Sequence, residues 1–195
     1  QRTAINTEAK WLLLSYAFET LLVERVLIKT DARNARSRAA IERIGGTPLG
    51  MAFDRNDNLY VCIGGMGLYR VTPDRKVEKV TDETNRSFHS VNDDSRLRLA
   101  DDLDITDDGR IYFSEATVRY EMHEWATDGL EARGNGRIIC YDTNTGKTHT
   151  VIRDLKFPNG VCIASDGKSF LFAETWGCTV KRYWFDGPKT GQTEM

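Results

Sequence analysis

The sequence has 195 residues, of which 40% are hydrophobic and 29% charged, with a net charge of −2. This composition is that of a globular chain able to bury a core, and its interspersed charges argue against a nucleic-acid or anionic-membrane partner. The longest apolar run near the start, "WLLLSYAF", is too short to span a bilayer and lacks signal-peptide flanks. We therefore expect a soluble, cytoplasmic protein.

Residues 1–45 predict a short α-β-α segment. After Asn6 or Thr7, apolar residues recur at three- and four-residue spacing, which indicates an amphipathic helix. The stretch "RVLIKT", residues 25–30, favours a strand. "DARNARSRAAIERIG" then begins with helix-start residues and ends at a glycine, which predicts a second helix.

This segment resembles a known family. "INTEAKWLLLSYAFE" followed by "RVLIKTDARNARSRAAIERIG" is similar to the C-terminal half of GNAT N-acetyltransferases of the ribosomal-protein alanine acetyltransferase type. The resemblance implies that Gln1 to Ala4 match the loop that binds the acetyl-CoA pyrophosphate at a helix N-terminus, and that Asn34 lies along the pantetheine arm. The strands that carry the substrate platform in that family have no counterpart here. We therefore expect neither acetyl-CoA binding nor acetyl transfer.

The apolar spacing changes from helical to alternating at Gly45-Gly46, so we place a domain boundary there, between residues 1–45 and 46–195. Each side resembles the interior of a different family. A fusion or assembled reading frame is the favoured interpretation, and a purposeful two-domain architecture is the alternative.

An internal repeat follows this boundary. "PLGMAFDRNDNLYV" (48–61), "ADDLDITDDGRIYF" (100–113) and "PNGVCIASDGKSFLF" (158–172) each contain an apolar strand, a turn and a second strand. Two further strand candidates follow in each of the first two units, whereas only "TVKRYWF" follows in the third. Four strands in a repeat of about 50 residues indicate a β-propeller blade. The predicted fold is mainly β, with about three blades of a propeller.

The alignment of the repeats places Leu49, Asp101 and Asn159 at one position, before each innermost strand at the mouth of the central channel. Ca²⁺ takes about six to eight oxygen ligands, and carboxylate and amide oxygens from adjacent blades supply that chemistry. Asp101 and Asn159 are therefore candidate metal ligands. The alternative is that both merely cap turns.

The propeller segment also resembles a known family. "LADDLDITDDGRIYFSEAT", "GNGRIICYDTNTGK" and "LKFPNGVCIASDGKSFLFAETW" are similar to strictosidine synthase-like six-bladed propellers, which are related to gluconolactonase and paraoxonase-type calcium hydrolases. The resemblance implies that Asn159, in its P-N-G segment, is a calcium ligand. Asp101 matches a second ligand, with Asp in place of the Asn of the family. The added negative charge either strengthens the binding of Ca²⁺ or takes the place of a metal. The plant synthase branch of the family does without a metal.

Other polar residues are expected on the same face. The loop 116–135 is long, and Tyr120, Met122, His123 and Trp125 either form a substrate-binding lid or belong to a solvated insertion.

His89 lies on a connection to this face and is a candidate general base, although lone histidines are usually structural. Glu115 and Glu174 follow the second strand of their units, and each is either a catalytic acid or base or a partner in a cap or salt bridge.

Two classes of function stay open. The first is metal-assisted hydrolysis of a small lactone or ester, and the second is a non-catalytic propeller that binds small ligands or partners. Because two side chains supply few of the ligands of Ca²⁺, we expect this chain to be inactive alone. Exposed blade edges also predict self-association.

Overall fold

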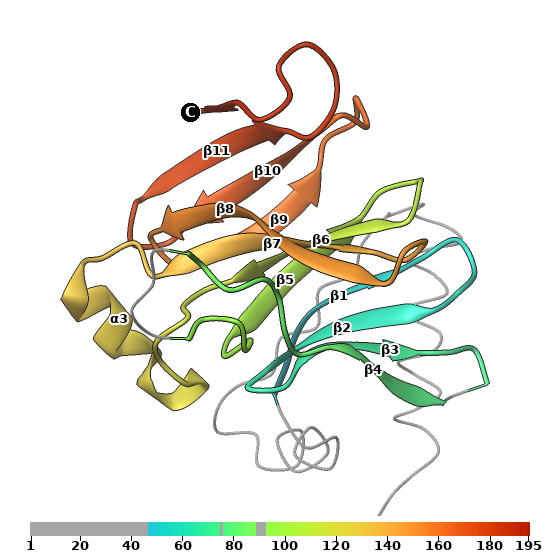
Figure 1. The fold of residues 1–195 in the computed structure, drawn as a ribbon, viewed down its shortest axis with the longest axis horizontal. Coiled ribbons are helices and arrows are strands. Elements are labelled where there is room, and N and C mark those ends of the chain that lie inside the picture. Colours follow the sequence, from blue (N-terminus) through green and yellow to red (C-terminus); the bar gives the residue numbers. More distant parts are fainter. Residues whose placement is uncertain (1–46, 75, 89–92) are drawn as a thin grey trace, which may run out of the picture. The chain divides into compact units, whose positions relative to one another are not determined.

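The structure is a computed structural model that describes residues 47–74, 76–88 and 93–195 (Figure 1). The chain divides into two compact units, Gln1–Ala39 and Ala40–Met195, and all described residues belong to the second. The predicted α-β-α segment, with Asn34, lies outside the described residues, as does His89. Among the residues that are described, no helix has both the length and the apolar character needed to cross a membrane.

The described residues form three four-stranded antiparallel sheets, in each of which the strands follow one another in chain order. The first blade contains β1 (Thr47–Phe53), β2 (Leu59–Gly64), β3 (Gly67–Val71) and β4 (Val77–Thr81). The second contains β5 (Ala100–Ile105), β6 (Arg110–Glu115), β7 (Gly136–Asp142) and β8 (Lys147–Leu155). The third contains β9 (Pro158–Ile163), β10 (Ser169–Glu174), β11 (Thr179–Trp184) and β12 (Thr193–Glu194). The mainly β fold with about three propeller blades is therefore confirmed.

The third blade corrects one prediction. No fourth strand was expected there from the sequence, but β12 pairs with β11 through Arg182 opposite Glu194 and Tyr183 opposite Thr193. A strand of two residues has no apolar alternation that a sequence pattern could reveal.

The turns of the repeat have a common backbone conformation. Between the first and second strand of successive blades, Asp57, Gly109 and Gly167 have φ angles of 59°, 87° and 61°. Glycine adopts these left-handed values without steric cost, and aspartate tolerates them better than most residues. This explains why the turn of each repeat carries an Asp or a Gly.

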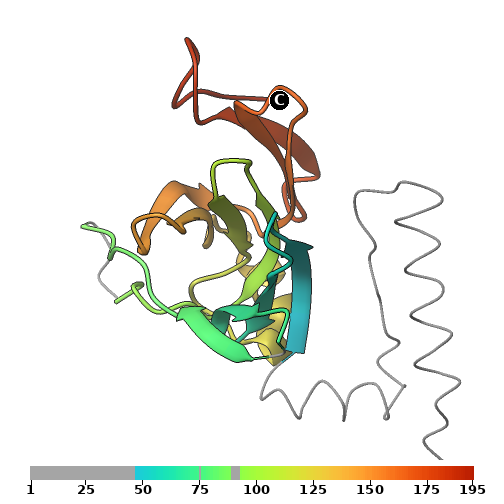
Figure 2. The same ribbon diagram turned by 90° about the vertical axis from the view of Figure 1, so that its right-hand side faces the viewer.

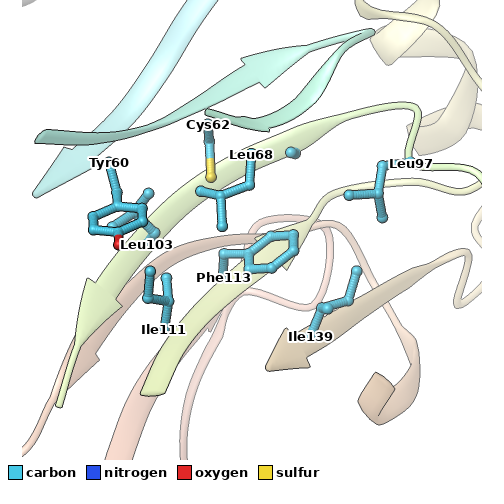
Figure 3. Close-up of a cluster of buried hydrophobic side chains, with 9 residues drawn as sticks. Tyr60, Cys62, Leu68, Leu97, Leu103, Ile111, Phe113 and Ile139 are labelled. Atoms are coloured by element: carbon cyan, nitrogen blue, oxygen red, sulfur yellow. The ribbon is translucent and has the colours of Figure 1, made fainter. Parts of the chain in front are cut away.

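Adjacent blades bury apolar side chains between them. The innermost strand β5 lies beside both β1 and β9, and Figure 2 shows the three sheets following one another. One core cluster joins the first and second blades (Figure 3), and it contains Tyr60, Cys62, Leu68, Leu97, Ala100, Leu103, Ile111, Phe113 and Ile139. A second cluster joins the second and third blades, and it contains Tyr112, Ile138, Cys140, Leu155, Val161, Phe170 and Phe172. Successive side chains along the strands of the second blade thus point to opposite faces of the sheet and pack into different core clusters.

The outer face of the third blade is more open. Leu171 and Val180 are 40% and 60% exposed. The apolar run around Cys162 predicts a buried thiol, but this prediction is wrong. Cys162 pairs with Leu171 across the β9–β10 ladder and is exposed as well. Its neighbour Val161 points instead into the core shared with the second blade. Cys62 and Cys140 are buried, as their apolar strands predicted.

Candidate functional site

Each innermost strand has a β-bulge near its start. The ladder is irregular between Pro48 and Met51 in β1, between Ala100 and Leu103 in β5, and opposite the Phe172–Glu174 step of β10 in β9. The bulged pairs are Leu49–Gly50, Asp101–Asp102 and Asn159–Gly160. Bulges redirect side chains and are frequent beside active sites. The three positions that the repeat aligns therefore share one local backbone feature.

The bulges of β1 and β5 approach each other closely at Gly50. A Cβ atom built on Gly50 would lie 2.8 Å from the carbonyl oxygen of Asp101 and would collide with the side chain of Asp102. Glycine is the residue that permits this approach. The missing side chain at Gly50 therefore makes room for the Asp101–Asp102 bulge.

Two aspartates of β5, Asp102 and Asp104, form hydrogen bonds to the third blade. Oδ2 of Asp102 accepts the backbone N–H of Val161 at 3.0 Å, and Oδ2 of Asp104 accepts that of Ile163 at 2.8 Å. These carboxylates thus supply acceptors for N–H groups of β9. Sequence reasoning missed both, although their alternate spacing along a strand shows that they share one face.

Ser114 of β6 connects the bulges of the second and third blades. Its side chain is fully buried. The hydroxyl accepts the N–H of Asp102 at 3.0 Å and donates to the carbonyl of Asn159 at 2.7 Å. No sequence motif singles out this serine, because both partners come from other strands.

The carboxyl group of Asp101 has unusual electrostatics. It is partly buried, and this burial together with the charge of Asp102 raises its pKa to about 7. No lysine, arginine or histidine of the described ranges forms a salt bridge with it. The side chain is therefore a partly desolvated carboxyl group without a cationic partner in this part of the chain.

The donor atoms of Asp101 and Asn159 suit a hard cation in type. Asn159, on the matching bulge, is exposed and carries an amide oxygen. Carboxylate and amide oxygens are ligands that Ca²⁺ prefers. Within the described residues, however, no group of three or more His, Cys, Asp or Glu side chains is placed to hold a metal. The two residues therefore fit a part of a calcium site.

Leu49, at the third aligned position, has an apolar role. It packs against a small cluster of Leu99, Ala116 and Phe157. A Cβ built on Gly64 would lie 3.7 Å from both Leu49 Cδ1 and Met122 Sδ, which places Met122 at the same end of the first blade.

Glu115 is held in a buried ion pair. Its Oε2 accepts Nε–H of Arg137 at 2.5 Å, and both side chains are at most 1% exposed. Its Oε1 accepts the backbone N–H of Arg98 at 2.6 Å. Burial raises the pKa of Glu115, against the opposing effect of the Arg137 guanidinium. These contacts favour the salt-bridge interpretation of this residue.

Glu174 has a similar environment in the third blade. Oε1 accepts the backbone N–H of Lys156 at 2.7 Å, and Oε2 pairs with the ammonium of Lys181. Burial acts to raise its pKa, but the Lys156 hydrogen bond and the Lys181 ammonium outweigh burial and lower it. A structural role is favoured here as well.

The segment 116–135, expected as a long loop, contains two short helices, η2 (Met122–Glu124) and α3 (Trp125–Glu131). The indole of Trp125 is stacked on that of Trp176, with ring centroids 5.8 Å apart, and Phe157 lies 5.2 Å from Trp176. Aromatic packing of this kind holds α3 against the β10–β11 turn, which carries Trp176, and against Phe157 on the connection between the second and third blades.

The candidate lid residues differ in exposure. Trp125 is 47% exposed, Met122 is 36% exposed, and His123 is exposed as well. Tyr120 is partly buried, with the Arg119 guanidinium 5.9 Å from its ring centroid. An ion pair of 3.0 Å between Arg98 and Glu121 attaches the start of η2 to the second blade.

Comparisons with known proteins agree with this architecture. Residues 101–188 match the strictosidine synthase family model, and residues 1–47 match the acetyltransferase (GNAT) domain model. Strictosidine synthase-like protein 3 of Arabidopsis thaliana is 33% identical over 155 residues, which cover 79% of this chain and 38% of that protein. The chain thus spans less than half the length of this curated relative.

Two solved structures share the fold. A gluconolactonase from Xanthomonas campestris is 15% identical with a TM-score of 0.55, and the match covers 76% of this chain and 48% of that chain. Regucalcin from Agrobacterium tumefaciens, described as a calcium-binding protein, is 17% identical with a TM-score of 0.50, and the match covers 76% and 44%. The propeller segment is therefore similar to the strictosidine synthase-like proteins and shares the fold of a gluconolactonase, and residues 1–47 are similar to the GNAT domain, as the sequence predicted.

Proposed function

We propose that the propeller segment supplies Asp101 and Asn159 to a calcium site of a hydrolase that acts on small lactones or esters. The observation that carries the proposal is the burial of the Asp101 carboxyl group without a cation beside it among the described residues. Glu115 and Glu174 are paired with Arg137 and Lys181, whereas Asp101 is partly buried without a cationic partner among the described residues. A divalent cation is the partner that its charge calls for.

The chemistry follows from the donor set. A bound Ca²⁺ supplies a Lewis acid that polarises a substrate carbonyl oxygen. The carboxylate of Asp101 and the amide oxygen of Asn159 would hold it, and the charge of Asp101 becomes fully developed once its proton is lost. His89 is the proposed general base that accepts a proton from the attacking water.

The segment 116–135 provides the proposed substrate contacts. Met122 lies beside Leu49 at the bulge end of the first blade, and Trp125 presents part of its indole to solvent. Together with Tyr120 and His123, they offer apolar and polar contacts of the kind that hold a small ring in a propeller mouth.

Calorimetric titration of the 195-residue chain with CaCl₂ tests the metal site. With few protein ligands, we expect a dissociation constant on the order of 10⁻⁴ to 10⁻³ M. Asp101→Asn and Asn159→Ala should each weaken binding at least about tenfold. Asp107→Asn is the matched control, because its side chain is 89% exposed and pairs with Arg55, which is 71% exposed. Equal calcium binding by the wild type and Asp101→Asn would refute the proposal.

A further inference from the structure

Two bulged strands leave backbone groups that their own ladders do not satisfy. A bulge removes one residue from regular pairing, and its N–H or C=O needs another partner. In β5 the N–H of Asp102 bonds to a side chain, and in β9 the carbonyl of Asn159 does the same. Both bonds end on the hydroxyl of Ser114.

The hydroxyl of Ser114 can make both bonds at once. It has one proton to donate and lone pairs to accept. The carbonyl of Asn159, at 2.7 Å, is a nearer acceptor for the proton than the carbonyl of Asp102, at 3.4 Å. The N–H of Asp102 is accepted at 3.0 Å. Since Ser114 belongs to the second blade and Asn159 to the third, this single atom bonds backbone groups on both sides of the blade boundary.

We propose that Ser114 is a positioning residue, which fixes the bulge that carries Asp101 relative to the bulge that carries Asn159. The inference rests on the proposed function, because the two bulges bear the proposed calcium ligands. The serine itself is fully buried and acts through the backbone of both strands. Its role is therefore to keep two ligand-bearing segments at the spacing that one cation requires.

The repeat supports a specific role for this hydroxyl. Glu115 and Glu174 end equivalent strands, so the residue equivalent to Ser114 in the third blade is Ala173. A second strand of this fold thus forms with alanine at this position. Ser114→Ala therefore removes the hydrogen bonds of this hydroxyl to Asp102 and Asn159 and introduces a residue that the fold already uses.

Ser169 offers a matched control. It is also fully buried on the second strand of a blade, but its hydroxyl bonds to Asp166 and accepts from Arg182. Ser169→Ala therefore removes a buried serine without touching either bulge.

The experiment measures calcium affinity and amide hydrogen exchange in the full chain. In Ser114→Ala we expect an affinity for Ca²⁺ that is about 10- to 100-fold weaker, as for other residues that orient metal ligands. The Asp102 amide should also exchange at least about tenfold faster without calcium, because its acceptor is gone. Ser169→Ala should leave both quantities unchanged, and Ser114→Cys, which keeps a weak donor and acceptor, should recover part of both.

Several outcomes would overturn the inference. One is unchanged exchange of the Asp102 amide in Ser114→Ala, and another is an equal loss of affinity in Ser114→Ala and Ser169→Ala. If the wild type binds no calcium, the proposed function fails separately. Faster exchange at Asp102 confined to Ser114→Ala would then still support Ser114 as the residue that positions the two bulges.

Discussion

Glu115 and Glu174 accept the same hydrogen bond in consecutive blades. Each ends the second strand of its blade, and each binds the backbone N–H of the residue two positions before the innermost strand, at 2.6 Å from Arg98 and 2.7 Å from Lys156. Each carboxylate also pairs with a cation from the third strand of its blade. Each glutamate therefore attaches the segment that leads into its blade to the second and third strands of that blade.

Glu115→Gln is expected to destabilise the fold strongly. The change leaves the buried Arg137 guanidinium with only the Asp94 carboxylate, 3.7 Å from its Nη1, as a counter-ion. Among the described residues, two of its nitrogens already lack a hydrogen-bond partner. Removal of one partner of a buried ion pair costs about 3–5 kcal/mol. Urea denaturation measures the loss, and Glu194→Gln on β12, at a side chain that is 53% exposed, is the control. Equal midpoints for the two variants would contradict the prediction.

Asp101→Asn is expected to stabilise the calcium-free chain at alkaline pH. The pKa of this carboxyl in the folded chain is about 7, above its ordinary 3.8, so the folded state binds the proton more tightly than the unfolded state does. Its stabilising contribution is present below about pH 4 and is lost as the pH rises through about 7. The amide mimics the neutral form and escapes this loss, which is at most about 4 kcal/mol.

Denaturation in EDTA at pH 4.5 and pH 8 measures the effect. The stability gained by Asp101→Asn over the wild type should be larger at pH 8. Asp107→Asn, which alters an exposed carboxylate on the same hairpin, should show no such difference. A gain for Asp101→Asn that is independent of pH would count against the assigned pKa.

Gly129→Ala is expected to destabilise the segment 116–135. In a free helix this change adds about 1 kcal/mol of stability. Here, however, the new Cβ would lie 2.9 Å from the indole of Trp176, so α3 must move away from its aromatic support. Thermal unfolding and proteolysis within residues 118–135 report the change, with Leu130→Ala, at a side chain that is 86% exposed, as the control. A higher melting temperature would show that α3 does not pack on Trp176.

The 195-residue chain alone is expected to hydrolyse lactones and aryl esters no faster than background, even with calcium present. Asp101 and Asn159 supply two side-chain ligands where Ca²⁺ takes about six to eight, so water would fill most positions and the ion would lose its fixed orientation. Turnover of phenyl acetate and of a δ-lactone, with and without EDTA, measures this. Activity abolished by both EDTA and Asn159→Ala would contradict the prediction.

The sequence predicted those features that repeat along the chain. The pattern of strand, turn and strand located three blades, and its alignment paired Leu49, Asp101 and Asn159, at which the structure has bulges. Turn chemistry at Gly109 and Gly167 is local and therefore visible in the sequence.

Contacts between blades could not be predicted in the same way. The bonds of Ser114 to Asn159 and of Asp102 to Val161 join residues that are 45 and 59 positions apart, and no spacing rule connects them. The helical turns of α3 were also missed, because a segment of seven residues with an internal glycine has little helical signal.

The hydrogen bond from Arg98 to Glu115 also bears on how such a blade can be duplicated in evolution. Both partners lie within residues 98–155, so a duplication of this stretch copies the donor and the acceptor together. Each copied blade would form this hydrogen bond without any contact to a neighbouring blade. A chain assembled from such stretches can gain or lose whole blades by recombination, because the hydrogen bond that secures each blade lies within the sequence of that stretch.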